Sequence, residues 1–297
     1  MPDHAKMREQ MNSGAGFIAA LDQSGGSTPK ALALYGVESS DYADDEEMFR
    51  LMHDMRARII LADAFTSDKV IGAILFERTM NDSIEGKPVA ELLWNDRGVV
   101  PFLKIDKGLE AEANGVQMLK PMPGLEELLQ EARAKGIFGT KERSVINEAN
   151  AEGVAAIVAQ QFEVARTVVE AGLVPILEPE VNIHSTTKEA AEEMLETEIS
   201  KHLDSLEDGV DVMLKLTLPS NSGLYDKIAA HPRVLRVVAL SGGYSTDQAS
   251  ALLAQNKSMI ASFSRALTEG LNVNQSNEEF QSALGGNIDK IYNASVA

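Results

Sequence analysis

The stretch Val212-Met213-Leu214-Lys215-Leu216 has the composition of a short buried strand, yet it carries a lysine near its end. Lysine is almost never fully buried unless another group compensates its charge. Burial favours the uncharged amine over the ammonium ion, and an uncharged amine is a nucleophile toward carbonyl carbon. The stretch therefore predicts a strand that ends in a Schiff-base lysine. The alternative is a strand-end lysine that extends its charge into solvent.

Apolar, strand-like runs of this kind recur along the whole chain. They cover residues 17–21, 70–77, 99–106, 137–141, 173–181, 212–216, 235–241 and 259–264. The segments between them have helical character, as in the stripe of apolar residues at three- and four-residue steps between positions 154 and 169. Three pairs have the capping-box spacing that begins a helix: Thr186 with Glu189, Ser245 with Gln248, and Ser276 with Glu279. Gly172 has the position of a helix end.

Strands that alternate with helices predict an α/β protein built from parallel units. Eight such units in 297 residues predict a single (β/α)8 TIM barrel over residues 1–297, since no domain boundary is visible. The alternative is an open, doubly wound sheet. Closure is favoured because no glycine-rich dinucleotide fingerprint follows the first strand. A closed barrel is also favoured because every predicted strand ends in polar residues, whereas an open sheet concentrates its site at the strands near one switch point.

The composition excludes several classes of function. A net charge of −18 argues against nucleic acid and membrane surfaces as partners, since both need a basic face. An anionic small substrate stays compatible with a cleft that gathers the few cations. The absence of cysteine excludes disulfides, zinc–thiolate sites and cysteine nucleophiles. The five histidines show no metal-ligand spacing, although a carboxylate-only magnesium site stays open.

The sequence also bears on location. Residues 1–10 are polar and charged, so they do not predict a signal peptide. No apolar run approaches the roughly 18 residues that a membrane-spanning helix needs. We therefore expect a cytoplasmic protein.

The chemistry of a barrel lies at the carboxyl ends of its strands, and here these ends are rich in charge. In chain order they carry Asp22, Glu77, Lys104 with Asp106, Lys141 with Arg143, Glu178 with Glu180, Lys215, Ser241, and Ser262 with Arg265. Strand alternation directs Met213 and Lys215 into the barrel and the residues beside them toward the helices. The ammonium groups of Lys141 and Lys104 would favour an uncharged Lys215. Each single pair is compatible with an ordinary solvated salt bridge, but the convergence of all of them favours a site.

The segment Glu178-Pro179-Glu180 ends the fifth predicted strand with two carboxylates on one face. Pro179 has no N–H and biases the residue before it toward an extended backbone. One carboxylate is then placed to shuttle protons while the other holds a lysine. The alternative is a strand terminator with two solvated acids.

Two further motifs predict phosphate binding. Ser241-Gly242-Gly243 follows an apolar strand and precedes a helix that begins near Ser245, so backbone N–H groups and the helix dipole favour an anion there. Arg265 supplies a guanidinium after the eighth strand, and phosphate sites after strands seven and eight recur in barrels. The run from Asp22 to Ser27 is a second candidate anion site. The alternative for each glycine pair is an ordinary turn.

Taken together, these motifs give the chain a family likeness over nearly its whole length. They are Gly16-Phe17-Ile18-Ala19-Ala20-Leu21-Asp22-Gln23-Ser24-Gly25-Gly26-Ser27, Pro101-Phe102-Leu103-Lys104-Ile105-Asp106-Lys107-Gly108, Leu173-Val174-Pro175-Ile176-Leu177-Glu178-Pro179-Glu180, Leu214-Lys215 and Leu240-Ser241-Gly242-Gly243. With these residues the chain resembles the class I fructose-bisphosphate aldolases, in particular the shorter bacterial branch.

The resemblance implies a metal-independent lyase without a cofactor that cleaves fructose 1,6-bisphosphate reversibly in glycolysis and gluconeogenesis. It implies that Lys215 forms the Schiff base, that Glu178 exchanges protons around that step, and that Asp22 takes the hydroxyl proton as the carbon–carbon bond breaks. The other implied roles are active-site lysines at Lys141 and Lys104, first-phosphate contacts at Ser241, Gly242 and Arg265, and second-phosphate contacts at Arg143 and Ser27. Sugar phosphates are the implied partners, and a homo-oligomer is left open.

Three residues depart from the pattern of the animal members of the family. Gln23 stands where they have glutamate, Ala31 stands where they have arginine, with Lys30 beside it, and Glu142 replaces a tryptophan. The first two departures concern the second phosphate site.

Two other functions remain compatible with the residues. A transaldolase or a deoxyribose-phosphate aldolase uses the same lysine chemistry on another sugar phosphate. A barrel that only binds phosphosugars or a protein would lack the chemistry, but the set of Lys215, Glu178 and Asp22 argues against it.

Overall fold

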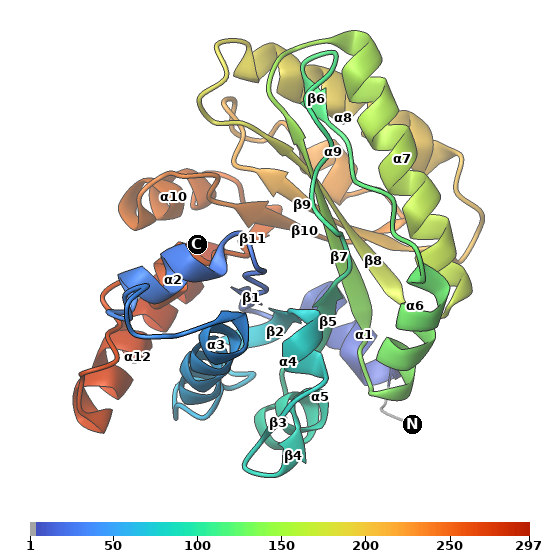
Figure 1. The fold of residues 1–297 in the computed structure, drawn as a ribbon. Coiled ribbons are helices and arrows are strands. Elements are labelled where there is room, and N and C mark those ends of the chain that lie inside the picture. The colour runs from blue at the N-terminus through green and yellow to red at the C-terminus, as the bar shows by residue number, and fades with distance from the viewer. Residues whose placement is uncertain (1–3) are drawn as a thin grey trace.

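The computed structural model describes residues 4–297, and its central feature is a ring of eight parallel strands surrounded by helices (Figure 1). The strands are β1 (Phe17–Leu21), β2 (Val70–Leu75), β5 (Val100–Lys104), β7 (Gly139–Ile146), β8 (Val174–Val181), β9 (Val212–Thr217), β10 (Val234–Leu240) and β11 (Met259–Ala261). Each pairs with the next in chain order. The predicted α/β (β/α)8 TIM barrel is confirmed, and the open sheet is wrong.

Short strands and helices complete the described chain. The strands are β3 (Ser83–Ile84), β4 (Lys87–Pro88) and β6 (Val116–Gln117). The helices are α1 (His4–Ser13), α2 (Thr28–Leu34), α3 (Asp45–Ile60), α4 (Glu77–Met80), α5 (Val89–Glu91), a π-helical turn (Leu92–Asp96), α6 (Leu125–Ala134), α7 (Ala151–Glu170), α8 (Lys188–Asp204), α9 (Asp226–Ala229), α10 (Thr246–Leu253), α11 (Arg265–Thr268) and α12 (Asn277–Ser295).

The strands separate two hydrophobic cores, as their alternation predicts. Leu214 and its outward neighbours pack with the helices, whereas Met213 packs inside the barrel with Phe102. Met7 and Met11 of α1 belong to the inner core, so α1 covers the amino end of the barrel. Burying each such side chain contributes about 1.5–3 kcal/mol. The inner core thus fills the lower barrel and leaves the carboxyl end for polar residues.

The ring has one seam without a ladder. Strands β1 and β11 are the two ends of the strand order, and within residues 4–297 no ladder hydrogen bonds join them. The two strands nevertheless contact each other. The barrel is therefore closed at this seam by side chains and loops, not by backbone pairing.

Strand β7 is longer than the sequence predicted. It runs to Ile146, five residues beyond the predicted end, because β8 pairs with its whole length and β6 pairs with its carboxyl end. Its outward residues are polar, which hid it from a search for apolar runs. Gln161 of α7 donates its side-chain N–H to the Ser144 hydroxyl at 2.8 Å, so these outward polar residues face α7.

Two of the three predicted capping boxes are confirmed, at Ser245 and Ser276. The box at Thr186 is wrong, because α8 begins at Lys188 after Thr187. The Glu189 carboxylate accepts a hydrogen bond from Asn221 instead of returning to the helix start. The predicted end of α7 is confirmed, with Gly172 at a φ of +76° just beyond it.

Two predictions concern the ends and the extent of the chain. Residues 1–3 of the polar amino terminus lie outside the described residues. In the part that is described, no helix is both long and apolar enough to cross a membrane. We propose that the chain is one domain, because α1 and α12 both pack against strands of the same barrel.

Candidate active site

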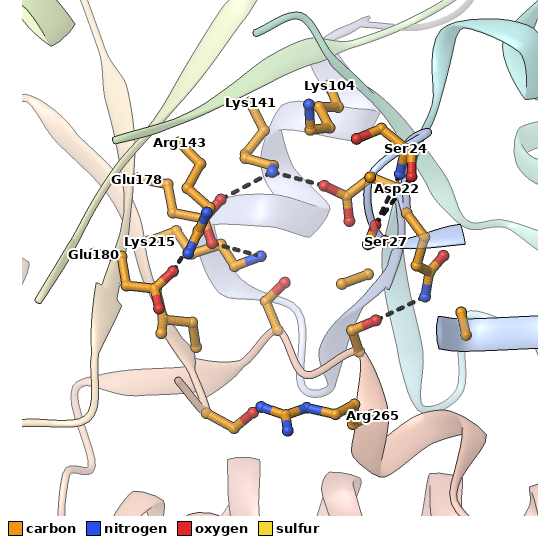
Figure 2. A pocket seen from close by; sticks show the side chains of 18 of the residues that line it. Asp22, Ser24, Ser27, Lys104, Lys141, Arg143, Glu178, Glu180, Lys215 and Arg265 are labelled. Atoms are coloured by element: carbon orange, nitrogen blue, oxygen red, sulfur yellow. Dashed lines mark hydrogen bonds and ion pairs between the residues drawn. The ribbon is translucent and has the colours of Figure 1, made fainter. Parts of the chain in front are cut away.

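A cavity of about 650 Å³ opens at the carboxyl ends of the strands, and charged side chains from several strands converge on it (Figure 2). Most of the residues predicted from sequence at this end of the barrel line it: Asp22, Ser27, Lys104, Asp106, Lys141, Arg143, Glu178, Glu180, Lys215, Ser241, Gly242, Ser262 and Arg265. The parallel strands explain this convergence, because their carboxyl ends meet at one end of the barrel.

The centre of the cavity is a chain of ion pairs. Lys141 Nζ lies 2.6 Å from Asp22 Oδ2 and 2.9 Å from Glu178 Oε2. Lys215 Nζ lies 3.1 Å from the other carboxylate oxygen of Glu178. Glu178 therefore bridges two lysines, and Lys141 bridges two carboxylates. Figure 2 shows these four side chains facing one another in the cavity.

Asp22 and Lys141 hold each other in their charged forms. Burial acts against the Asp22 carboxylate, but the ammonium groups of Lys141 and Lys215 outweigh it and lower the pKa of Asp22 well below its usual range. Burial likewise acts against the Lys141 ammonium, but the carboxylates of Asp22 and Glu178 raise the pKa of Lys141 well above its usual range. Lys141 is thus a permanent cation and Asp22 a permanent carboxylate at neutral pH.

Lys215 has the position that a nucleophile needs. Only 4% of its surface is exposed, yet it lines the cavity. Lys141 and Lys215 share Glu178, which contacts one lysine side chain with each of its carboxylate oxygens. Glu178, in direct contact, is placed to accept the proton that the amine releases. The predicted inward placement of Lys215 is observed, whereas its chemical role stays a prediction.

Two further ion pairs form the wall near β5, β7 and β8. Lys104 Nζ lies 2.7 Å from the Asp106 carboxylate, and Arg143 Nε donates to the Glu180 carboxylate. Burial opposes the Arg143 charge, but Glu180 outweighs it and raises the pKa of Arg143. Glu180 thus compensates an arginine, whereas Glu178 is the carboxylate of this segment that contacts lysines.

The candidate anion site after β10 differs in part from the prediction. Ser241, Gly242 and Arg265 line the cavity, and Gly242 turns the chain at a φ of +59°. Gly243 is not among the described residues that line it. The start of α10 is satisfied by its own capping box instead of facing the cavity.

Glu77 is the predicted strand-end residue that does not join the cavity. It begins α4, and its carboxylate pairs with Lys107 at 2.8 Å. Glu77 is not among the described residues that line the cavity. The extension of the second predicted strand to residue 77 was therefore wrong, since β2 ends at Leu75.

Sequence reasoning missed two helices that contribute to the site. It named Lys30 but not the helix that carries it: α2 lines the cavity with Lys30 and Leu34, and Pro29 in its first turn was a signal for its start. Helix α3 places Arg56 directly behind Gln23, where only 2% of the arginine is exposed. A single arginine among the apolar positions of α3 was the available signal.

Comparison with known proteins adds an independent line of support. A family model described as class I fructose-bisphosphate aldolase matches residues 4–220. Among solved structures, fructose-bisphosphate aldolase of Plasmodium falciparum, in complex with TRAP and a small-molecule inhibitor, has a TM-score of 0.77 and 21% identity, over 99% of this chain and 94% of that one. The protein Cgl0159 of Corynebacterium glutamicum has a TM-score of 0.57 and 12% identity, over 99% and 93%. At such identities the structural matches establish the fold alone.

Proposed function

Because the chain belongs to the class I fructose-bisphosphate aldolase family, a family of carbon–carbon lyases, we propose that Lys215 is its Schiff-base residue. The observation that carries this proposal is the buried Lys215 amine at 3.1 Å from Glu178, inside the cavity. The reaction of the family is the reversible cleavage of fructose 1,6-bisphosphate to dihydroxyacetone phosphate and glyceraldehyde 3-phosphate.

The first half of the reaction forms the covalent adduct. Glu178 accepts a proton from Lys215, and the free amine attacks the C2 carbonyl carbon of the sugar. Glu178 then returns the proton to the C2 hydroxyl, which leaves as water, and a C=N bond forms. Lys141 stays charged beside the forming iminium, and Asp22 and Glu178 supply the compensating negative charge.

The second half breaks the C3–C4 bond. Asp22 accepts the proton of the C4 hydroxyl, the C4 oxygen becomes the aldehyde of glyceraldehyde 3-phosphate, and the bond pair moves to C3 to give an enamine on Lys215. Protonation at C3 and addition of water then release dihydroxyacetone phosphate and restore the amine. The lowered pKa of Asp22 keeps it a carboxylate, which is the form that accepts a proton.

Cations at the two sides of the cavity support binding of a bisphosphate. Arg265 and the Ser241-Gly242 turn lie after β11 and β10, and Ser27 and Lys30 lie on the α2 side. We assign the first group to one phosphate and the second group, with Arg143, to the other. Contacts to groups far from the reacting bond supply positioning energy.

The test is fructose 1,6-bisphosphate cleavage by the wild type and by Lys215→Met in the presence of a metal chelator. We expect the wild type to turn over at full rate and Lys215→Met to lose activity by about 10⁴-fold or more, as when a covalent nucleophile is removed. Faster cleavage of the bisphosphate than of fructose 1-phosphate would support two anion sites. Turnover by Lys215→Met near the wild-type rate would refute the assignment.

The family reaction belongs to glycolysis, and on that basis we propose the cytoplasm as the place of action. Sugar phosphates are the partners that follow from the family. The net charge of −18 continues to disfavour nucleic acid.

A further inference from the structure

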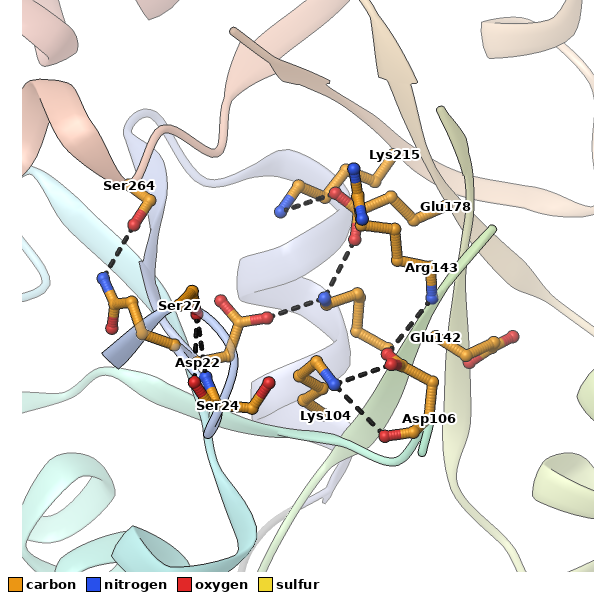
Figure 3. Close-up of polar contacts among 12 residues, drawn as sticks. Asp22, Ser24, Ser27, Lys104, Asp106, Glu142, Arg143, Glu178, Lys215 and Ser264 are labelled. Atoms are coloured by element: carbon orange, nitrogen blue, oxygen red, sulfur yellow. Dashed lines mark hydrogen bonds and ion pairs between the residues drawn. The ribbon is translucent and has the colours of Figure 1, made fainter. Parts of the chain in front are cut away.

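The seam between β1 and β11 is bridged at the mouth of the barrel by one side chain. Gln23 follows Asp22 at the end of β1, and its Nε2 donates a hydrogen bond of 2.7 Å to the Ser264 hydroxyl. Ser264 is the N-cap residue of α11, which begins with Arg265. The bridge therefore joins the turn that carries the Asp22 carboxylate to the start of α11, where Arg265 follows Ser264 (Asp22 and Ser264 are labelled in Figure 3).

Arg56 of α3 anchors the other side of Gln23. Its Nη2 donates to the Gln23 backbone carbonyl at 2.6 Å and to the Gln23 side-chain oxygen at 3.3 Å. Its Nη1 donates to the Thr79 hydroxyl at 2.8 Å. With both ends of its amide engaged, Gln23 has one donor and one acceptor fixed by protein groups. The side chain therefore has a single orientation between Arg56 and Ser264.

Arg56 is an unusual buried cation. Only 2% of it is exposed, and within residues 4–297 no carboxylate lies within ion-pair distance of it. Burial lowers the pKa of Arg56 to about 10, while the Asp22 carboxylate acts in the opposite direction. Arg56 thus stays charged at neutral pH, and the negative charge that compensates it is the proposed proton acceptor. The guanidinium directs its hydrogen bonds to Gln23 and to Thr79.

We propose that Arg56 and Gln23 form a relay that positions Asp22 and Arg265 relative to each other across the unpaired seam. The inference rests on the proposed function, since it deepens the roles of those two residues. Arg56 fixes the backbone of the Asp22 turn, and the Gln23 amide fixes the start of α11. Gln23 is a positioning residue and needs no contact with the reacting atoms.

The two parts of the relay predict different kinetic effects. In Gln23→Leu the Ser264 hydroxyl loses its donor and α11 is released, while Arg56 still holds the backbone carbonyl of residue 23. We expect KM for fructose 1,6-bisphosphate to rise about tenfold, the effect of one hydrogen bond, with kcat changed less than about threefold. In Arg56→Met the backbone anchor itself is lost, so kcat should fall as well.

Gln23→Glu is the matched conservative variant. A carboxylate at this position accepts hydrogen bonds from both Arg56 and the Ser264 hydroxyl, so it preserves the bridge with the direction of one bond reversed. We expect KM to return to within about threefold of the wild type, in contrast to Gln23→Leu. A Ser264→Ala change should raise KM in the wild type but add nothing in the Gln23→Leu background, since the bond is already lost.

Stability and kinetics together decide the proposal. Equal melting temperatures of Gln23→Leu and Gln23→Glu, with a KM difference between them, would support positioning over a purely structural role. The proposal would be overturned by an unchanged KM in Gln23→Leu or by an equal KM in Gln23→Leu and Gln23→Glu. It would also be overturned if the effects of Gln23→Leu and Ser264→Ala on KM were fully additive. Wild-type cleavage and the Lys215 adduct are measured in parallel, so loss of the relay is distinguished from failure of the proposed function.

Discussion

Lys141 and Glu142 are neighbours on β7, and both are buried, but they lie on opposite faces of the strand. Lys141 points into the barrel and pairs with Asp22 and Glu178. Glu142 points outward toward α7, and neither of its carboxylate oxygens has a hydrogen-bond partner within the described chain. Figure 3 shows its carboxylate directed away from the cluster of charges. One strand thus buries one compensated and one uncompensated ionisable group.

The two residues respond to burial in opposite ways. The carboxylates around Lys141 overcome the effect of burial and keep its ammonium charged. For Glu142, burial raises the pKa well above its usual range, and the nearby Asp106 carboxylate adds to the effect. The comparison teaches that Lys141 keeps its charge in the barrel because it is paired, and that Glu142 is neutralised against α7 because its position offers no pairing.

The largest effect is expected for Lys141→Met. The change leaves two facing carboxylates, Asp22 and Glu178, buried without their shared cation. We expect the free energy of unfolding to fall by about 3–5 kcal/mol, the cost of breaking a buried pair. Activity should fall by about 10³-fold, because the network that acts as a unit is disrupted. Urea denaturation and the cleavage assay measure the two effects, and near-wild-type values of both would show that the pairing is dispensable.

Asp22→Asn is expected to have the next largest effect, and it acts on one step. The amide cannot accept the C4 hydroxyl proton, so cleavage should slow by about 10²-fold. Schiff-base formation with dihydroxyacetone phosphate should persist, since Lys215 and Glu178 are unchanged. Single-turnover kinetics separate adduct formation from cleavage. Undiminished cleavage would remove Asp22 from the proposed step.

Glu142→Leu is expected to stabilise the protein. At pH 8 we expect the free energy of unfolding to rise by about 1–3 kcal/mol, which is the cost of a buried polar group without a partner. The raised pKa means that the folded state keeps a proton that the unfolded chain releases above about pH 4.3. The contribution of Glu142 to the stability of the wild type is therefore highest below that pH and declines as pH rises toward the folded pKa. The increase in the free energy of unfolding caused by Glu142→Leu should therefore become larger as pH rises.

Glu142→Gln is the matched control for that prediction. It keeps the size and polarity of the side chain but cannot ionise, so it should remove the pH dependence without the full gain of leucine. Thermal unfolding from pH 5 to pH 9 measures both variants. If the free energy of unfolding of the wild type changed with pH in the same way as that of Glu142→Gln, the result would contradict the uncompensated burial of Glu142.

The smallest effect is expected for Lys201→Ala on α8. Lys201 pairs with Glu198 at 2.6 Å, but 62% of its side chain is exposed. Solvent screening limits such a pair to about 0.2–1 kcal/mol, and often less. We therefore expect a change in the free energy of unfolding below about 0.5 kcal/mol and no change in activity. A loss comparable to that of Lys141→Met would show that burial is not what distinguishes these pairs.

Much of the fold followed from local pattern. The apolar runs around Leu214 and Ile176 fill the barrel and the helix interface, so hydrophobicity alone located their strands. The carboxyl half of β7 did not follow, because Ser144 on its outer face is polar and is accommodated by a hydrogen bond from Gln161 of α7. Such contacts leave no periodic signal in the sequence.

The site followed from the rule that strand ends converge. That rule placed Lys215, Glu178 and Asp22 together before any distance was known. It could not find Arg56, because a helix residue reaches the mouth only through the packing of α3 against the barrel. Gly243 was misplaced because the motif indicated a phosphate turn but not which of its glycines faces inward.

The central claim is that the Lys215 amine forms a covalent bond with a ketose. Its most direct test is mass spectrometry of the intact protein after borohydride reduction with dihydroxyacetone phosphate, followed by peptide mapping. The account predicts one added phosphosugar per chain, located on Lys215 and lost in Lys215→Met. An unmodified protein, or a label on Lys141 or Lys104 with Lys215 untouched, would contradict it.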